Sequence, residues 1–199
     1  MTGIFKLSLP GEVRGVLPQF HSDVATATAS FGQGVMATPL QLVMGYGALA
    51  NGGVLMRPYV VSRIAPADGG PPVDVTPRAL RQVVSLEVTH QITAMLEGVV
   101  QKGGTAEAGA IPGYRVAGKT GTAQKVDPIS GTYSVDKLFS SFVGYLPAQT
   151  PRVVIGVFLD EPKGEHFGGM IAAPIFGEIA LGTMRQLGIP ADQIGRAHV

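Results

Sequence analysis

The chain has 199 residues and a formal net charge of +1, with 15% charged and 45% apolar residues. The apolar fraction is too high for a disordered chain, and the balanced charge leaves no electrostatic footprint for nucleic acid. No run of apolar residues and glycine, Val153–Leu159 included, is long enough to cross a bilayer. Because cysteine is absent, the chain has neither a disulfide scaffold nor a thiolate zinc site. The sequence is that of a globular chain with few charges for its size.

The first half of the chain predicts two helices joined by an extended segment and a loop. Thr38 is a good capping residue, Pro39 suits a first helical turn, and Asn51-Gly52-Gly53 suits a helix end. Ser85 can cap the second helix in the same way. The expected elements are irregular structure over 1–20, a helix between Pro39 and Asn51 with Leu40, Val43, Met44 and Gly47 on one face, an extended segment over 56–64, a loop over 65–74, and a helix from Ser85 to Gly103 with Val88, Ile92, Met95, Leu96 and Val99 on one face.

The second half predicts strands followed by one helix. The expected strands are 114–123, 138–146 and 152–159, and the five residues 147–151 are short enough to make a hairpin. Gly168-Gly169 is expected to be a break, followed by a helix over 170–187 with Ile175, Ile179 and Gly182 on one side. Helices first, then adjacent strands, then a helix favour an α+β fold with an antiparallel sheet flanked by helices.

Two sequence motifs overlap within residues 113–122, and they predict different kinds of site. Gly113 to Thr120 matches the phosphate-binding pattern G-x-x-x-x-G-K-[ST], but that loop needs a helix starting at its lysine. The residues before Lys119 alternate like a strand, and Gly121-Thr122 after it does not begin a helix. A nucleotide-binding site is therefore only a remote alternative.

The second pattern is Lys119-Thr120-Gly121-Thr122, a K-T-G motif on a predicted strand. A serine acyl-transferase for peptide carboxylates uses such a lysine as a cation near the nucleophile and the substrate. Thr120 and Thr122, at positions i and i+2, present their hydroxyls on one strand face for the carboxylate. Gly121 permits close approach of the substrate backbone, and a strand edge can offer the Thr122 N–H to an oxyanion.

Around this motif the chain resembles the transpeptidase domain of class B penicillin-binding proteins, the enzymes of division or elongation. The segments that carry the resemblance run in the family's order along nearly the whole chain. They are Leu9-Pro10-Gly11-Glu12, Thr28 to Gly34, Thr38 to Leu42, Ala50 to Gly53, Gly118 to Gln124 and Gly168 to Phe176.

The resemblance implies a partial serine transpeptidase/β-lactamase-like fold with a five-stranded antiparallel sheet and the K-T-G strand lining a cleft. It implies D-Ala-D-Ala stem peptides as substrates, β-lactams as inhibitors and no cofactor or metal. Lys119 and Thr122 are the expected catalytic residues, and Thr120, Gly121, Thr122 and Phe167 the expected substrate-binding residues. His166 fits either the cleft wall or an ordinary exposed loop histidine.

The chain departs from the family in lacking its two upstream motifs. No S-x-N occurs, and the only S-x-x-K, Ser134 to Lys137, follows the K-T-G instead of preceding it. The nucleophile belongs at a helix start, where its lysine lies one turn later on the same face. On an extended segment positions i and i+3 point to opposite sides, so Ser134 is interpreted as part of a solvated loop.

We therefore interpret residues 1–193 as the C-terminal portion of a transpeptidase domain that lacks its nucleophile and is inactive alone. The intact enzyme is expected at the extracytoplasmic face of the bacterial inner membrane, held by an N-terminal anchor and working with the division or elongation machinery. A non-catalytic penicillin- or peptide-binding module, or sensor, is the alternative. Residues 194–199 resemble the translation of a sequencing-library adapter and are interpreted as an adapter-derived tail.

Overall fold

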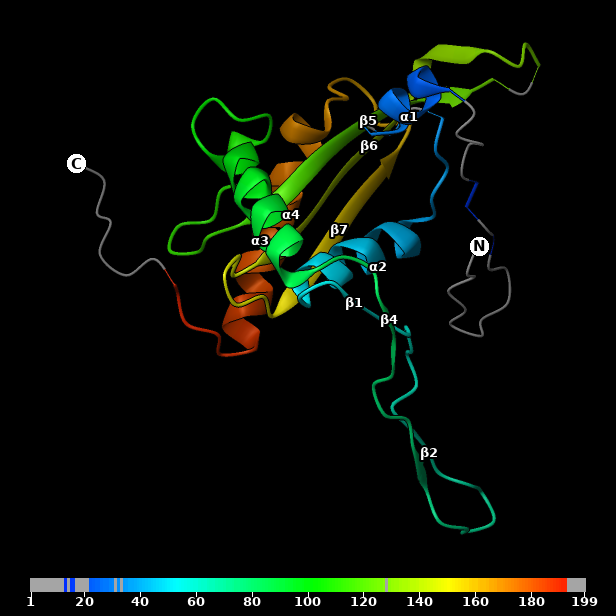
Figure 1. Cartoon of the computed structure of the whole chain (residues 1–199), viewed down its shortest axis with the longest axis vertical. Coiled ribbons are helices and arrows are strands. Elements are labelled where there is room, and N and C mark those ends of the chain that lie inside the picture. The colour runs from blue at the N-terminus through cyan, green and yellow to red at the C-terminus, as the bar shows by residue number, and fades with distance from the viewer. Residues whose placement is uncertain are drawn as a thin grey trace.

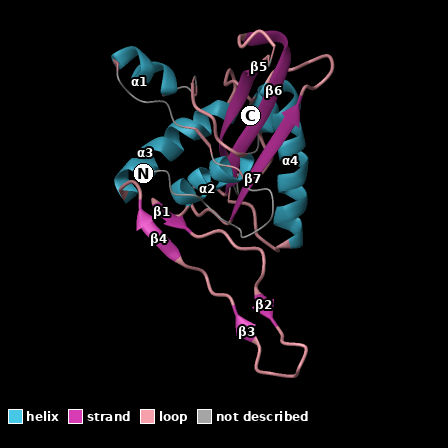
Figure 2. Cartoon of the chain, turned by 90° about the vertical axis from the view of Figure 1, so that its right-hand side faces the viewer, coloured by secondary structure: helices cyan, strands magenta, loops and turns pink. Residues whose placement is uncertain are grey.

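The computed structural model describes residues 13, 15–16, 22–30, 32, 34–127 and 129–192. Its centre is an antiparallel three-stranded sheet in the order β5 (Ala117–Val126), β6 (Tyr133–Leu146) and β7 (Val153–Asp160). Figure 2 shows α4 (Gly168–Gln186) on one side of this sheet and α2 (Pro39–Ala50) and α3 (Leu86–Glu97) on the other. The predicted antiparallel sheet flanked by helices is confirmed. The described residues provide three strands in it where the resemblance implied five.

Two hydrophobic clusters, one on each face of the sheet, hold these layers together. Alternate residues of β6 point to opposite faces, so Phe142 and Leu146 pack against α4 while Tyr145 packs against α2 and α3. On the α4 side the ring centroids of Phe142 and Phe176 lie 4.7 Å apart. The sheet is thus buried on both faces along its centre, and its functional groups must come from an edge or an end.

The helix starts in the first half were predicted correctly because side-chain caps determine them. Thr38 Oγ1 accepts from the Gln41 N–H (3.2 Å), and the Gln41 side chain accepts from the Thr38 N–H (2.9 Å), which completes a capping box for α2. Ser85 Oγ accepts from the Val88 N–H at the start of α3 (3.3 Å). The end of α3 was predicted too late: it stops at Glu97, and two short 3-10 helices, η1 (Gly98–Val100) and η2 (Glu107–Gly109), follow.

The predicted inward face of α3 is wrong in part. Val88 and Met95 are exposed, whereas Thr89 and Thr93 are buried. Thr93 Oγ1 lies 2.7 Å from the Tyr145 hydroxyl, so a polar contact to β6 fixes the rotation of this helix. A buried hydroxyl with a partner can replace an apolar side chain at such a position.

The predicted face and start of α4 are also corrected. Gly168-Gly169 is not a break but the first turn of the helix, and Ile175 and Ile179 are 38% and 47% exposed. The face that meets the sheet consists of small residues together with one aromatic and one thioether side chain: Ala172, Ala173, Phe176, Ala180 and Met184. Small residues let the helix approach the sheet closely, which the count of large apolar residues did not reveal.

The strand boundaries moved by several residues. β5 begins and ends three residues after the strand predicted over 114–123, because Tyr114 pairs with Ile111 in a turn before β5. The second begins at Tyr133, so Ser134 to Lys137 lie within β6 instead of in the predicted loop. The third strand and the hairpin before it agree with the prediction.

An arm extends away from the body of the molecule (Figure 1). It begins beyond the two-stranded ladder of β1 (Val54–Met56) and β4 (Ala79–Gln82), and continues into β2 (Arg63–Ile64) and β3 (Val73–Asp74). The extended segment predicted over 56–64 is strand only at its two ends, and the loop predicted over 65–74 ends in β3. Residues 57–82, all of which the structure describes, include no buried residue.

The N-terminal part contributes one element that was not predicted, the short helix α1 (Asp23–Ala29), capped by Ser22. Two stretches interpreted above, residues 9–12 and the tail 194–199, lie outside the described residues. Among the helices that the structure describes, none combines the length and the apolar character required to cross a membrane.

Candidate active site

The K-T-G residues lie on β5, which is the edge strand of the sheet. Lys119 is exposed, pairs across the ladder with Val143, and therefore belongs to the sheet face covered by α2 and α3. Its ammonium bends toward the next residue of the strand and donates to the Thr120 carbonyl oxygen (3.0 Å). Among the ion pairs between described residues, none involves Lys119. Its positive charge is thus available at the open edge of the sheet.

Thr120 and Thr122 lie on the opposite face, toward α4, as their i and i+2 spacing predicts. Thr120 Oγ1 lies 3.4 Å from Thr105 Oγ1, a hydroxyl from the segment between η1 and η2 that the sequence analysis did not single out. The register places Gly121 opposite Ser141, and a Cβ on Gly121 would lie 2.5 Å from Ser141 Oγ. The K-T-G motif lies on a strand, as predicted, while the roles of its residues remain predictions.

The N-terminus of α4 meets this edge strand directly. The Gly168 N–H donates to Thr122 Oγ1 (3.1 Å), which satisfies one of the amides that a helix start leaves free. A Cβ on Gly168 would collide with the carbonyl oxygens of Ser141 and Gly121, and one on Gly169 with the carbonyl oxygen of Thr105. Only glycine allows this approach, and it brings the positive end of the helix dipole next to the K-T-G segment.

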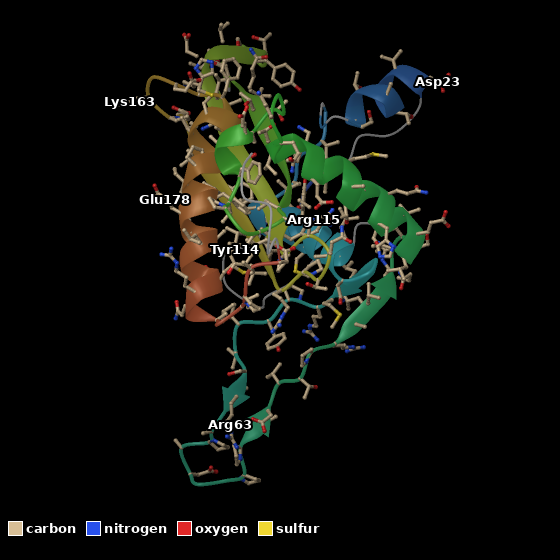
Figure 3. All side chains as sticks on the ribbon, turned by 90° about the vertical axis from the view of Figure 1, so that its left-hand side faces the viewer. Asp23, Arg63, Tyr114, Arg115, Lys163 and Glu178 are labelled. Atoms are coloured by element: carbon tan, nitrogen blue, oxygen red, sulfur yellow. The ribbon has the colours of Figure 1, made fainter. Side chains whose placement is uncertain are left out.

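The loop before α4 carries the other two predicted residues. Lys163, which precedes this loop in the chain, lies at the end of the molecule where α4 begins. It is far from Arg63 on the arm (Figure 3). His166 is half-buried and its ring centroid lies 4.8 Å from that of Phe167, which is 57% exposed. The buried Ser140 hydroxyl donates to the His166 carbonyl oxygen. Ser140 was missed, although its place on β6 opposite Thr122 could be anticipated once the register is known.

Glu165 organises this loop electrostatically. Its carboxylate accepts from the Phe167 N–H (3.0 Å) and the His166 N–H (2.9 Å). These two bonds, the Phe167 bond foremost, hold the pKa of Glu165 below its ordinary value of 4.5. The contribution to stability is therefore present above the unfolded-state pKa and is lost as the pH falls through the lower folded-state pKa.

We expect the Glu165 carboxyl carbon, followed by NMR, to titrate with a midpoint below 4.5. The variant Glu165→Gln identifies the resonance and keeps the side chain's shape. It should also flatten the acid limb of the curve of unfolding free energy against pH. A midpoint at or above the ordinary glutamate value would show that the two backbone bonds do not form in solution.

The two competing patterns are not supported by the geometry. Lys119 lies within β5 and no helix begins there, so the phosphate-binding loop is excluded. Ser134 lies in β6, and its Oγ accepts from the backbone N–H groups of Asp136 (3.3 Å) and Lys137 (3.1 Å). No hydrogen bond among the described residues joins the Lys137 ammonium to this hydroxyl, and the helical geometry of a nucleophile is missing.

Comparison with known proteins agrees with this geometry. Residues 3–181 match the family "Penicillin binding protein transpeptidase domain". Stage V sporulation protein D of Bacillus subtilis is 42% identical over 187 residues, which are 92% of this chain and 28% of that protein. The peptidoglycan D,D-transpeptidase FtsI of Escherichia coli K12 is 36% identical over 191 residues, which are 94% of this chain and 30% of that protein.

The fold has solved counterparts as well. Penicillin-binding protein 3 of Mycobacterium tuberculosis superposes with a TM-score of 0.84 at 35% identity, over 96% of this chain and 45% of that one. That protein has also been solved in complex with aztreonam and with ampicillin. The chain thus spans less than a third of the length of the two curated relatives named above. It belongs to the transpeptidase domain family of the class B penicillin-binding proteins.

Proposed function

We propose that the protein carrying this chain is a peptidoglycan D,D-transpeptidase, which cross-links the cell wall and is acylated by β-lactams. The observation that carries the proposal is the Lys119-to-Thr122 segment at an open sheet edge, beside the N-terminus of α4, in a chain of this family. A lysine with no ion pair among the described residues and a helix N-terminus make that edge electropositive. Such an edge suits the terminal carboxylate of a stem peptide.

The proposed reaction is acyl transfer in two steps. A serine that this chain does not contain attacks the carbonyl of the penultimate D-Ala, and the C–N bond breaks so that terminal D-Ala leaves as an amine carrying a proton. The amine of a neighbouring stem peptide then attacks the acyl-serine, the ester C–O bond breaks, and the amine gives one of its own protons to the serine oxygen as the cross-linking amide forms. Lys119 supplies electrostatic and proton-network support, Thr120 and Thr122 hold the carboxylate, and the Thr122 N–H stabilises the oxyanion.

The edge position of β5 explains how an extended peptide would bind. An edge strand presents unpaired N–H and C=O groups, to which a peptide can add as a further strand. Gly121 has no side chain to obstruct it, and Phe167 and His166 would form a wall at its end. β-Lactams, found bound in the Mycobacterium tuberculosis relative, would occupy the same edge.

The same proposal places the protein outside the cytoplasmic membrane, where peptidoglycan is assembled, with an anchor N-terminal to this chain. The division or elongation machinery would be its partner. The 1–193 portion would be the C-terminal part of the transpeptidase domain, followed by the unrelated tail 194–199.

The experiment is labelling with a fluorescent penicillin. We expect the complete protein encoded around this chain to form a covalent adduct that survives denaturation, and the isolated chain to form none. Ser134→Ala should leave labelling of the complete protein unchanged. Absence of labelling in the complete protein would support the non-catalytic module, and labelling of the isolated chain that Ser134→Ala abolishes would overturn the interpretation of Ser134.

A further inference from the structure

We propose that Ser140 is a positioning residue, which holds the loop of residues 165–167 beside Thr122 of the K-T-G strand and thereby places the wall that substrate meets. The inference deepens the proposed function and rests on it. Ser140 touches neither substrate nor the reacting atoms in this proposal. It acts through the backbone of His166 and the exposed ring of Phe167.

The first support is a pair of anchors on facing strands. Thr122 of β5 and Ser140 of β6 are cross-strand partners, so their side chains leave the same face of the sheet. Ser140 donates to the His166 carbonyl oxygen, and Thr122 accepts from the Gly168 N–H. The two bonds grip the backbone immediately before and after Phe167, one from each strand.

The second support is the contrast in burial. Ser140 is fully buried and polar, and its hydroxyl finds its partner in the loop carbonyl. Phe167 is 57% exposed, so packing alone does not fix its ring. The position of the ring therefore depends on the backbone anchors, of which the Ser140 bond is the one made from the sheet interior.

The third support is that Ser140 and Thr122 join the loop region to the sheet, whereas the bonds of Glu165 stay within the loop. Glu165 accepts from the N–H groups of His166 and Phe167, which shapes the loop internally but does not join it to the sheet. The attachment to the sheet comes from Ser140 and Thr122. Loss of the Ser140 bond would leave the loop shaped but displaced, and displacements of about 1 Å can cost about 100-fold in rate.

The test measures acylation of the complete protein by a fluorescent penicillin in stopped flow, which separates the initial binding constant from the acylation rate. We expect Ser140→Ala to lower the second-order acylation constant by about tenfold, within the range that misplacement produces. Ser140→Cys, of similar shape and with a weak S–H donor, should give a smaller loss. It also keeps the test decisive if the alanine variant fails to fold.

A double-mutant cycle separates positioning from simple stabilisation. If Ser140 acts through the wall, Ser140→Ala should cost little in a Phe167→Ala background, whereas a purely structural role would give additive losses. Thr93→Ala is the matched control, since it removes another buried hydroxyl bond, to Tyr145, and should lower thermal stability without changing acylation. Normal acylation of a folded Ser140→Ala variant, or additivity in the cycle, would overturn the inference alone. A complete protein that is never acylated would overturn the proposed function and this inference with it.

Discussion

Replacing Lys119 by alanine in the complete protein is expected to lower the acylation rate constant for a fluorescent penicillin by about 100-fold or more, the usual effect of removing one preorganised charge partner. Lys119 forms no ion pair within the described part of the chain, so no internal partner neutralises its charge before substrate arrives. Its only described bonds go to Thr120, and substrate can displace them. Lys119→Arg should retain part of the rate because it keeps the charge.

The control lies on the same strand. Lys125 forms ion pairs with Asp160 (2.9 Å) and Glu161 (2.7 Å), so its charge is already matched. Lys125→Ala should leave acylation unchanged. Equal losses in Lys119→Ala and Lys125→Ala would mean that general positive charge, and not the K-T-G lysine, matters for the reaction.

The second large effect concerns Gly169. A methyl group there would run into the carbonyl oxygen and carbon of Thr105, which are backbone atoms and cannot rotate away. We expect Gly169→Ala to lower the free energy of unfolding by about 3 kcal/mol or more, at the upper end of overpacking effects. Denaturant unfolding followed by circular dichroism measures it.

The same helix offers a matched substitution. A Cβ on Gly177 would meet nothing within 4 Å, so Gly177→Ala should be neutral or should stabilise the helix by up to about 1 kcal/mol. The comparison separates the general benefit of alanine in a helix from the steric conflict at Gly169. If both variants unfold at the same denaturant concentration, α4 does not approach the Thr105 backbone in solution as closely as described.

The elements whose ends depend on local chemistry could be predicted from the sequence. Thr38, Gln41 and Ser85 start their helices by capping, which depends on residues three positions apart. The faces of α3 and α4 could not be predicted in the same way, because burial of Thr93 depends on Tyr145 from a distant strand. The small residues of α4 face the sheet because they let the helix pack closely against it, and this contact joins segments that are far apart in the sequence.

For the candidate site, the motif predicted the strand and the shared face of Thr120 and Thr122, because alternation along a strand is a local property. The same alternation places Lys119 on the other face, but it could not predict that the ammonium would bond to the Thr120 carbonyl oxygen. Nor could it identify Ser140 and Thr105, since their contacts follow from strand register and from the path of the chain after η1. Contacts between segments that are far apart in the sequence thus bring Ser140 and Thr105 to the candidate site.

The arm beyond β1 and β4 is under fewer packing constraints than the body of the molecule. A backbone bond from the Arg57 N–H to the Arg78 carbonyl oxygen closes its base, and the exposed residues beyond add nothing to either hydrophobic cluster. We therefore expect insertions, deletions and substitutions between these two arginines to leave the three-stranded sheet and the K-T-G edge undisturbed. A fluorescent or affinity label placed on this hairpin would report on the protein without reaching the K-T-G edge.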